Sequence, residues 1–317
     1  MKQHSLKGQV ALVAGATRGA GRGIACALGE LGATVYCSGR STRKKPATEG
    51  RRETIEETAA MVTTRGGKGI AVRCDHLEPA EVKKLVSRIK REQNARLDIL
   101  VNDIWVGDTL CEFGKTFWQV SLDKGFRMLR QAIDTHIITS RYAVPLMRER
   151  GCGLIVEVTD GDFFGYRGNL FYDLAKISVI RLAMAMAYEL RKTEIAAVAL
   201  TPGFLRSEAM LDNFGVREEN WRDAGKKNPD FLASETPLLV GRAVAALAAD
   251  CDRKAKSGQV LSSWVLSDEY GLTDADGSRP HWGRHFRKKY GTYPAFDDTL
   301  YRTFREGPIG LVYPKWP

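Results

Sequence analysis

The sequence predicts an α/β protein with a doubly wound parallel sheet, formed as a single domain with a C-terminal extension. Short aliphatic segments alternate with longer amphipathic segments along most of the chain. A glycine-rich turn follows the first aliphatic segment, and polar residues follow several later ones. Strands separated by helices imply right-handed crossovers and a parallel sheet covered on both faces. Such sheets bind ligands beyond the carboxyl ends of their strands.

The expected strands are runs of aliphatic residues at 9–13, 34–37, 70–73, 97–101, 154–158, 195–200 and 259–262. The expected helices lie between them, at 22–31, 53–65, 79–93, 124–150, 171–192 and 237–249. Gly32 and Gly66 favour helix ends, and Pro79 suits a first helical turn. Residues 103–125 are predicted to be rich in loops, and residues 202–236 to be irregular with short helical pieces.

We expect residues 1–266 to form one ligand-binding domain and residues 267–317 an extension packed on it. A segment at about 203–235, polar and glycine-containing, resembles a mobile substrate lid. Aromatic residues in the extension are expected to cap the site or a neighbouring subunit. They are Trp282, Tyr290, Tyr293, Tyr301, Tyr313 and Trp316.

Composition limits the class of protein. The hydrophobic share of 44% is typical of a packed globular chain of 317 residues. No run approaches the roughly 18 apolar residues of a membrane span, and the first residues lack a signal-peptide pattern. We therefore expect a cytoplasmic protein without a membrane partner. The six cysteines are scattered singly, which argues against a metal site and a disulfide scaffold.

The formal net charge of +10 indicates an anionic partner. The excess lies in two clusters, at residues 40–52 and 279–289. Basic and aromatic residues do not interleave as in RNA-binding sheets, so no nucleic-acid partner is expected. A phosphorylated small molecule explains the first cluster better.

The first turn predicts a dinucleotide site of the Rossmann type. It reads Ala14-Gly15-Ala16-Thr17-Arg18-Gly19-Ala20-Gly21, between an expected strand and an expected helix. Glycines let the backbone turn tightly and approach a pyrophosphate, and the helix N-terminus favours its charge. A tight turn without a ligand is the alternative. The contacts expected are Gly15, Thr17, Arg18, Gly19, Ala20 and Gly21.

Arginine replaces the acidic residue that selects NAD at the end of the second strand. Arg40 and Arg18 can grip a 2′-phosphate through charge-assisted bonds, which favours NADP(H) over NAD(H). Alternatively, both arginines point to solvent. Asp75 and Asn102 follow the third and fourth strands, where each is either a cofactor contact or a plain turn residue.

Tyr172 and Lys176 stand four apart in an expected helix, so they share one face. A phenol has a pKa of about 10, and a nearby ammonium lowers it. The pair thus predicts an acid/base for a carbonyl being reduced or an alcohol being oxidised.

These motifs resemble the short-chain dehydrogenase/reductase family over roughly residues 6–266. The residues that carry this resemblance, in chain order, are Gly15/Gly19/Gly21, Asp75, Leu100-Val101-Asn102, Tyr172-x-x-x-Lys176 and Pro202-Gly203. The resemblance implies an NADP(H)-dependent oxidoreductase with Tyr172 as acid/base. It also implies that Lys176 holds the nicotinamide ribose, that Pro202, Gly203 and Ser207 position the nicotinamide, and that the chain forms a homodimer or homotetramer.

The chain departs from the family at three places. The usual serine, twelve or thirteen residues before the tyrosine, is replaced by Asp160 or Thr159. Thr159 is the expected oxyanion donor and Asp160 the rival. The usual proton-relay asparagine falls at Ala132; His136 is a possible substitute, although helix packing is the favoured interpretation. The family's Asn-Asn-Ala-Gly becomes Asn102-Asp103-Ile104-Trp105.

The expected substrate is a small carbonyl or alcohol compound. Trp105, Phe163, Phe164 and Phe204 predict an apolar pocket, with core or lid packing as the alternative. Acidic residues at the same rim, Asp103, Asp160 and Asp162, suggest a cationic or polyhydroxylated substrate. The competing function is an NADP(H)-binding regulatory protein with impaired catalysis, which the changes at Ala132 and Asp160 motivate.

Overall fold

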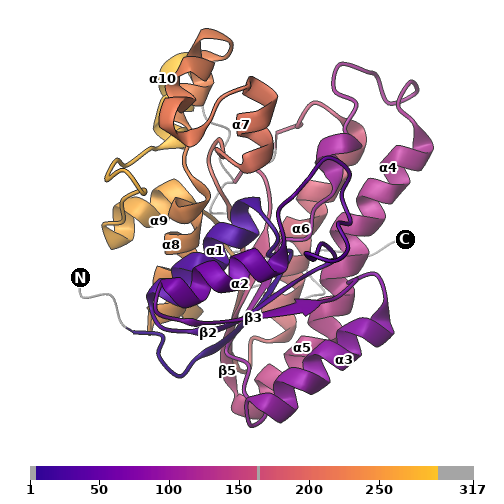
Figure 1. Cartoon of the computed structure of the whole chain (residues 1–317), viewed down its shortest axis with the longest axis vertical. Helices are drawn as coiled ribbons and strands as arrows, with labels where there is room; N and C mark the ends of the chain where they lie inside the picture. The colour runs from indigo at the N-terminus through magenta and orange to yellow at the C-terminus, as the bar shows by residue number, and fades with distance from the viewer. Residues whose placement is uncertain (1–4, 163–164, 292–317) are drawn as a thin grey trace, which may run out of the picture.

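A computed structural model describes residues 5–162 and 165–291 of the chain. Its sheet has seven parallel strands in the order β3-β2-β1-β4-β5-β6-β7 (Figure 1). The predicted doubly wound fold is therefore confirmed. The strands are β1 (Val10–Ala14), β2 (Thr34–Gly39), β3 (Lys68–Arg73), β4 (Ile99–Asn102), β5 (Cys152–Val158), β6 (Glu194–Thr201) and β7 (Val260–Ser262).

Helices cover both faces of this sheet. The α-helices are α1 (Gly19–Glu30), α2 (Ile55–Thr64), α3 (Pro79–Glu92), α4 (Leu122–Leu129), α5 (Thr135–Arg150), α6 (Leu170–Glu189), α7 (Glu208–Phe214), α8 (Pro237–Ala249), α9 (Ser263–Tyr270) and α10 (Trp282–Tyr290). Apolar residues of α1, α2 and α8 pack on one face, whereas those of α3, α5 and α6 pack on the other.

Alternation along the strands produces these two cores. In β1, Ala11 and Val13 join the core beneath α1 and α8, whereas Val10 and Leu12 join the core beneath α3 and α5. All five residues of β1 are buried, as expected for a central strand with helices on both sides. β1 lies between β2 and β4, where the strand order reverses.

Close packing of α1 on α8 fixes the start of α1. A Cβ on Gly23 would lie 1.9 Å from the carbonyl oxygen of Pro237, and one on Gly241 would lie 2.3 Å from that of Gly23. Only glycine allows such an approach of two helix backbones. The first turn of α1 is thereby held at the carboxyl ends of β1 and β4.

The expected helix at 124–150 is interrupted. α4 ends at Leu129, Arg130–Asp134 forms a π-helical turn, and α5 follows. Helix propensity continues across this stretch, so local sequence gives no sign of the wider turn. π-helical turns are often found at functional sites, and this one contains Ala132.

The segment after β6 contains short helical pieces, as the sequence predicted. Residues 202–236 contain α7 and two 3-10 segments, Glu218–Lys226 and Pro229–Ala233, around buried Trp221 and Phe231. The boundary expected after residue 266 falls inside α9. α10 packs its Trp282 edge-to-face on Phe204, and α7 and α10 lie near each other beyond one end of the sheet (Figure 1).

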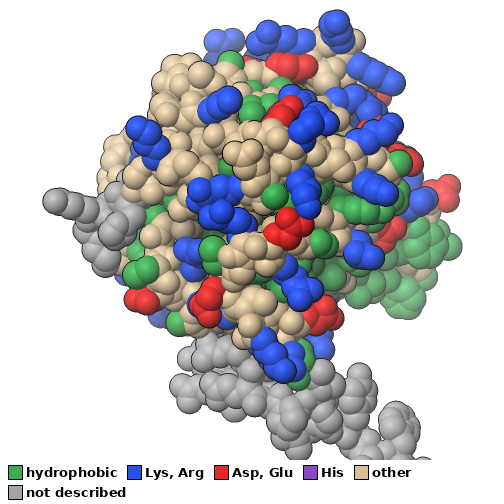
Figure 2. All heavy atoms as spheres, turned by 90° about the horizontal axis from the view of Figure 1, so that it is seen from below, with side chains coloured by type: hydrophobic (Ala, Val, Ile, Leu, Met, Phe, Trp, Pro, Cys, Tyr) green, Lys and Arg blue, Asp and Glu red, His purple; other side chains and the backbone are tan. Residues whose placement is uncertain are grey.

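Exposed apolar side chains gather on one side of the molecule. Phe117 and Trp118 are 62% and 71% exposed, and Phe126 of α4 is 59% exposed. Figure 2 shows hydrophobic side chains concentrated on the side where α4 lies, and Lys and Arg side chains spread over the rest of that face. Among the described residues, no helix combines the length and the apolar character needed to cross a membrane.

Candidate active site

Most of the predicted site residues meet at the carboxyl ends of the strands. The glycine-rich turn follows β1, Asn102 ends β4, and Asp160 follows β5. Tyr172 and Lys176 lie in the first turns of α6. This edge of the sheet includes the point where the strand order reverses, which is where open α/β sheets bind their ligands.

The glycine-rich turn forms a cradle that side chains would fill. Gly15 has a φ of +92°, and a Cβ there would lie 2.3 Å from the carbonyl oxygen of Asp103. A Cβ on Gly21 would lie 2.4 Å from the carbonyl oxygen of Gly15. Two glycines are thus required by the backbone itself, and the turn leads directly into α1. The residues present therefore fit a bound pyrophosphate.

The first amide of α1 already holds an anion supplied by the chain itself. The Gly19 N–H donates to Glu208 Oε2 at 2.8 Å, and Arg22 lies 3.3 Å from the other oxygen of that carboxylate. Here the Glu208 carboxylate stands in for a phosphate oxygen. Sequence reasoning missed Glu208, whose only signal is its place directly after Ser207, the N-cap of α7.

The two arginines expected at the 2′-phosphate have acidic neighbours. Arg40 lies 3.9 Å from Asp75 across the ends of β2 and β3, and both side chains are partly exposed. Arg18 donates to Thr48 at 3.1 Å and lies 3.9 Å from Glu53. Arg18 belongs to the glycine-rich turn, and Arg40 directly follows β2. The NADP(H) contacts predicted for both remain a prediction.

Asn102 is part of a buried polar network beneath the site. Its Nδ2 donates to Glu157 Oε1 at 2.7 Å and to Ser140 at 3.0 Å. His136 Nδ1 lies 2.6 Å from the other oxygen of Glu157. In the described part of the chain, Asn102 Oδ1 and His136 Nε2 are buried without a hydrogen-bond partner. His136 thus ties α5 to β5, in keeping with a helix-packing role.

Tyr172 is fixed by the start of α6 and by two aromatic rings. Asn169 caps the helix by accepting from the amides of Phe171 and Tyr172, each at 3.1 Å. Trp105 and Phe113 meet the Tyr172 ring edge-to-face, at centroid distances of 5.5 and 5.4 Å. The Lys176 ammonium lies 3.9 Å above the Trp105 ring and 5.7 Å from the centre of the Tyr172 ring.

The hydroxyl of Tyr172 donates to Asp160 Oδ2 at 2.6 Å. Burial and this carboxylate hold the pKa of Tyr172 well above its usual value. The expectation that Lys176 lowers the phenol's pKa is therefore wrong for this structure. The ammonium faces the Trp105 ring, and the carboxylate faces the hydroxyl.

Thr159 is directed elsewhere. Its hydroxyl donates to the backbone carbonyl of Lys176 at 2.8 Å, and the side chain is buried. It is Asp160, the rival, that contacts Tyr172. Both positions follow β5 directly, so the sequence alone did not separate them.

The remaining predicted residues lie in different places. Phe204 packs on Phe231 of the segment after β6 and on Trp282 of α10. The alternative interpretation, packing of the expected lid, therefore describes Phe204 better than a role in a substrate pocket does. The Gly203 N–H donates to buried Glu235 at 3.0 Å, and Pro202 precedes it after β6. Phe163 and Phe164 lie outside the described residues.

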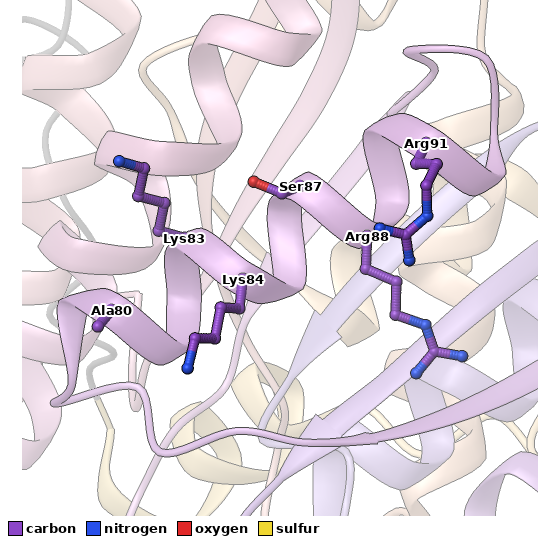
Figure 3. Close-up of a pocket in the computed structure, with 6 residues that line it drawn as sticks. All are labelled: Ala80, Lys83, Lys84, Ser87, Arg88 and Arg91. Atoms are coloured by element: carbon purple, nitrogen blue, oxygen red, sulfur yellow. The ribbon is translucent and has the colours of Figure 1, made fainter.

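A separate surface hollow lies along α3, away from these groups. It is lined by Ala80, Lys83, Lys84, Ser87, Arg88 and Arg91 (Figure 3). All six residues belong to one helix, and none is a predicted site residue. We therefore assign no part of the candidate site to it.

Comparisons with known proteins show the family of the chain and agree with its fold. The family model described as short chain dehydrogenase matches residues 9–215. A mouse protein named dehydrogenase/reductase SDR family member 1 is 37% identical over 86% of this chain and 85% of its own length. An Arabidopsis thaliana protein named NADPH-dependent aldehyde reductase 2, chloroplastic, is 30% identical over 64% of this chain and 74% of its own. A solved putative dehydrogenase from Xanthomonas campestris, 22% identical, covers 87% of this chain and 95% of its own with a TM-score of 0.71.

A buried histidine below the site makes stability depend on pH. His76 lies between Ser38 at 3.0 Å and Thr139 at 2.7 Å. Burial, with His136 nearby, lowers its pKa from 6.5 to about 3. Between pH 6.5 and about 3, the unfolded chain binds a proton at His76 that the folded chain does not bind. The folded state is therefore favoured fully above pH 6.5, and it loses free energy of unfolding as the pH falls below that value.

We expect this histidine to remove about 1.4 kcal/mol of unfolding free energy for each pH unit below that value. Urea unfolding measures this pH dependence of the free energy of unfolding. The native chain and His76→Gln are compared at neutral pH and at two mildly acidic pH values. The variant should show the shallower pH dependence. Parallel pH profiles for the two proteins would contradict the assignment.

Proposed function

The chain belongs to the short-chain dehydrogenase/reductase family, and from that premise we propose that it is an NADP(H)-dependent oxidoreductase that interconverts a carbonyl compound and an alcohol. One observation carries the proposal: Tyr172 and Lys176 lie at the ligand-binding edge of the sheet that also holds the glycine-rich turn. The bound nicotinamide would supply or accept the hydride. The chain's residues would bind both reactants and handle the proton.

The cofactor would lie across the switch point. Gly15, Gly19 and Gly21 would cradle the pyrophosphate, which would replace the Glu208 carboxylate at the Gly19 amide. Lys176 would hold the nicotinamide ribose, and the backbone around Gly203 would position the nicotinamide. Trp105 stands where relatives have glycine, and it would give the wall of the cofactor site an aromatic face beside the Lys176 ammonium.

Tyr172 would exchange the proton. Its raised pKa keeps the phenol protonated near neutral pH, which suits a donor to a carbonyl oxygen during reduction. The reverse reaction requires phenolate, which the neighbouring Asp160 disfavours. Reduction is therefore the proposed direction.

NADP(H) is proposed over NAD(H) because Arg40 and Arg18 lie beside the expected ribose, and no acidic residue ends β2. The chloroplast relative named as NADPH-dependent supports the same preference. A homodimer or homotetramer is proposed as well. It is supported by the exposed aromatic side chains Phe117, Trp118 and Phe126 near and on α4.

The second candidate is an NADP(H)-binding regulatory protein with impaired catalysis. The contact between Asp160 and Tyr172 favours it, because a carboxylate opposes the charge that develops on a carbonyl oxygen. Both candidates bind cofactor, and turnover distinguishes them.

Tyr172→Phe tests the catalytic assignment. Losing the hydroxyl removes the proton donor, so reduction of a carbonyl panel should fall by about 10²–10⁴-fold. The fall in NADPH absorbance measures turnover, and fluorescence titration measures cofactor affinity, which should remain within a factor of about two. Tyr188→Phe, near the other end of α6, is the matched control. Native turnover in Tyr172→Phe would refute the role.

Arg40→Asp tests the cofactor preference. Replacing a guanidinium by a carboxylate should weaken NADPH binding by about tenfold or more, because a charge-assisted bond to phosphate is lost and a repulsion is introduced. NADH binding should not weaken. Calorimetry on both cofactors gives the ratio, with Arg43→Asp on the same loop as control. An unchanged NADPH affinity would show that Arg40 does not contact the phosphate.

Glu208→Gln tests whether the chain's own carboxylate competes with the pyrophosphate. Glutamine keeps the size of the side chain but loses its charge, so its bond to the Gly19 amide is weaker than that of the native glutamate. The pyrophosphate then displaces this side chain at a smaller cost in free energy. We expect NADPH to bind about threefold to tenfold more tightly, which corresponds to roughly 1 kcal/mol. The same calorimetry applies, and Glu219→Gln in the lid is the control. Weaker binding in Glu208→Gln would mean that Glu208 supports the cofactor instead.

A further inference from the structure

The reacting end of the site carries a negative charge where relatives carry a neutral hydroxyl. Asp160 Oδ2 accepts from the Tyr172 hydroxyl at 2.6 Å, so the carboxylate lies next to any atom that this hydroxyl contacts. Thr159 does not provide the missing hydroxyl donor, because its Oγ1 donates to the Lys176 carbonyl at 2.8 Å.

This arrangement distinguishes two kinds of hydride acceptor. Hydride addition to a carbonyl places negative charge on oxygen, and a carboxylate in contact with that oxygen raises the barrier. Hydride addition to an iminium ion removes positive charge from nitrogen. A carboxylate binds that cation before the reaction, and it repels no charge in the product, which is a neutral amine.

The aromatic surroundings favour a substrate that contains a flat ring. Trp105 and Phe113 stand edge-to-face around Tyr172, and the Trp105 ring already carries the Lys176 ammonium 3.9 Å from its centre. Aromatic side chains pack well against flat ring systems. A cyclic substrate with an aromatic ring therefore suits this lining better than an aliphatic one does, and the positive charge is matched by Asp160 alone.

We propose that this site takes imines that react as iminium cations, and that Asp160 is the catalytic residue that binds the cationic nitrogen. This inference rests on the proposed NADP(H)-dependent hydride transfer, and it replaces the carbonyl group by an imine, to which Tyr172 donates no proton. The nitrogen N–H would donate to the Asp160 carboxylate beside the Tyr172 hydroxyl, which keeps its own bond to Oδ2. Tyr172 would then orient the carboxylate and close the site.

The reaction balances without a proton from the protein. The reduced nicotinamide gives a hydride to the iminium carbon, and a C–H bond forms. The C=N π bond breaks, and its electron pair becomes the lone pair of the amine nitrogen. The products are a neutral amine and the oxidised nicotinamide, and the amine takes a proton from water after release.

The change at Ala132 fits this chemistry. In relatives, the family resemblance implies an asparagine that resupplies a proton through the lysine. Here that position is Ala132, which is buried in the π-helical turn. A substrate that arrives already protonated consumes no proton from Tyr172, so no relay is needed. One substrate class thus accounts for both Asp160 and Ala132.

The experiment compares matched acceptors with the full-length chain and NADPH. Dihydroisoquinoline, a cyclic imine, and tetralone, a ketone of similar size, are assayed at neutral pH by loss of NADPH absorbance. We expect kcat/KM for the imine to exceed that for the ketone by about 10²-fold, the scale of one well-placed electrostatic contact. Asp160→Asn should remove most of that preference, and Asp160→Ser should raise ketone reduction.

A binding measurement without cofactor provides a second readout. Calorimetry compares tetrahydroisoquinoline, a cation at neutral pH, with tetralol, a neutral alcohol. Asp160→Asn should weaken amine binding by about tenfold or more and leave the alcohol unchanged, as expected for loss of a charge-assisted bond. Asp252→Asn, which removes one charge from an exposed turn, is the control for net charge. Unchanged NADPH affinity in Asp160→Asn shows that the variant is folded.

The outcomes separate the two proposals. Preference of the native chain for tetralone, or equal amine binding by the native chain and Asp160→Asn, overturns the imine inference and leaves the proposed oxidoreductase standing. If neither compound oxidises NADPH, both proposals fall.

Discussion

The hydrogen bond between Tyr172 and Asp160 determines what the site can do. It places a carboxylate at the reacting end and, together with burial, raises the pKa of the phenol. In a site with Ser at this place, the phenol and the hydroxyl would both donate to one oxygen. Here the phenol's proton is already engaged by a carboxylate, so a substrate must displace that bond or pair with the carboxylate itself. A cationic group does the second.

Two different elements of the fold position Asp160 and Tyr172 next to each other. Asp160 follows β5, and Tyr172 begins α6, which returns over the sheet. Thr159, one residue before Asp160, bonds to the carbonyl of Lys176 and so joins the end of β5 to α6. Below them, Glu157 accepts from Asn102 and pairs with His136, joining β4, β5 and α5. Thr159, Glu157, Asn102 and His136 thus help to fix the positions of Asp160 and Tyr172.

Much of the fold was predictable because its signals are local. Aliphatic runs, a glycine cradle and Pro237 at the start of α8 each reflect a few neighbouring residues, and the predicted bounds of 237–249 match α8. Contacts between distant residues were not predictable. Tyr172 and Asp160 were both named as candidates, yet the sign of the phenol's pKa shift depends on which side chain turns toward it. The π-helical turn and the place of Glu208 follow from packing that no local pattern encodes.

The lid and the cofactor site share one set of charges. Glu208 and Asp212 stand one turn apart on α7; the first meets the Gly19 amide and Arg22, and the second meets Arg51 at 2.6 Å. The partly buried Arg22 and Arg51 would be costly to leave without an anion, because burial removes the water that solvates them. Arg22 also pairs with Glu57 at 2.6 Å and Arg51 with Glu53 at 2.5 Å, so each guanidinium keeps a counter-charge when its bond to α7 is lost. A pyrophosphate bound at the Gly19 amide, as proposed, would displace Glu208, which shares α7 with Asp212. Occupancy of that position would thus be linked through α7 to the pairing of Arg51 with Asp212.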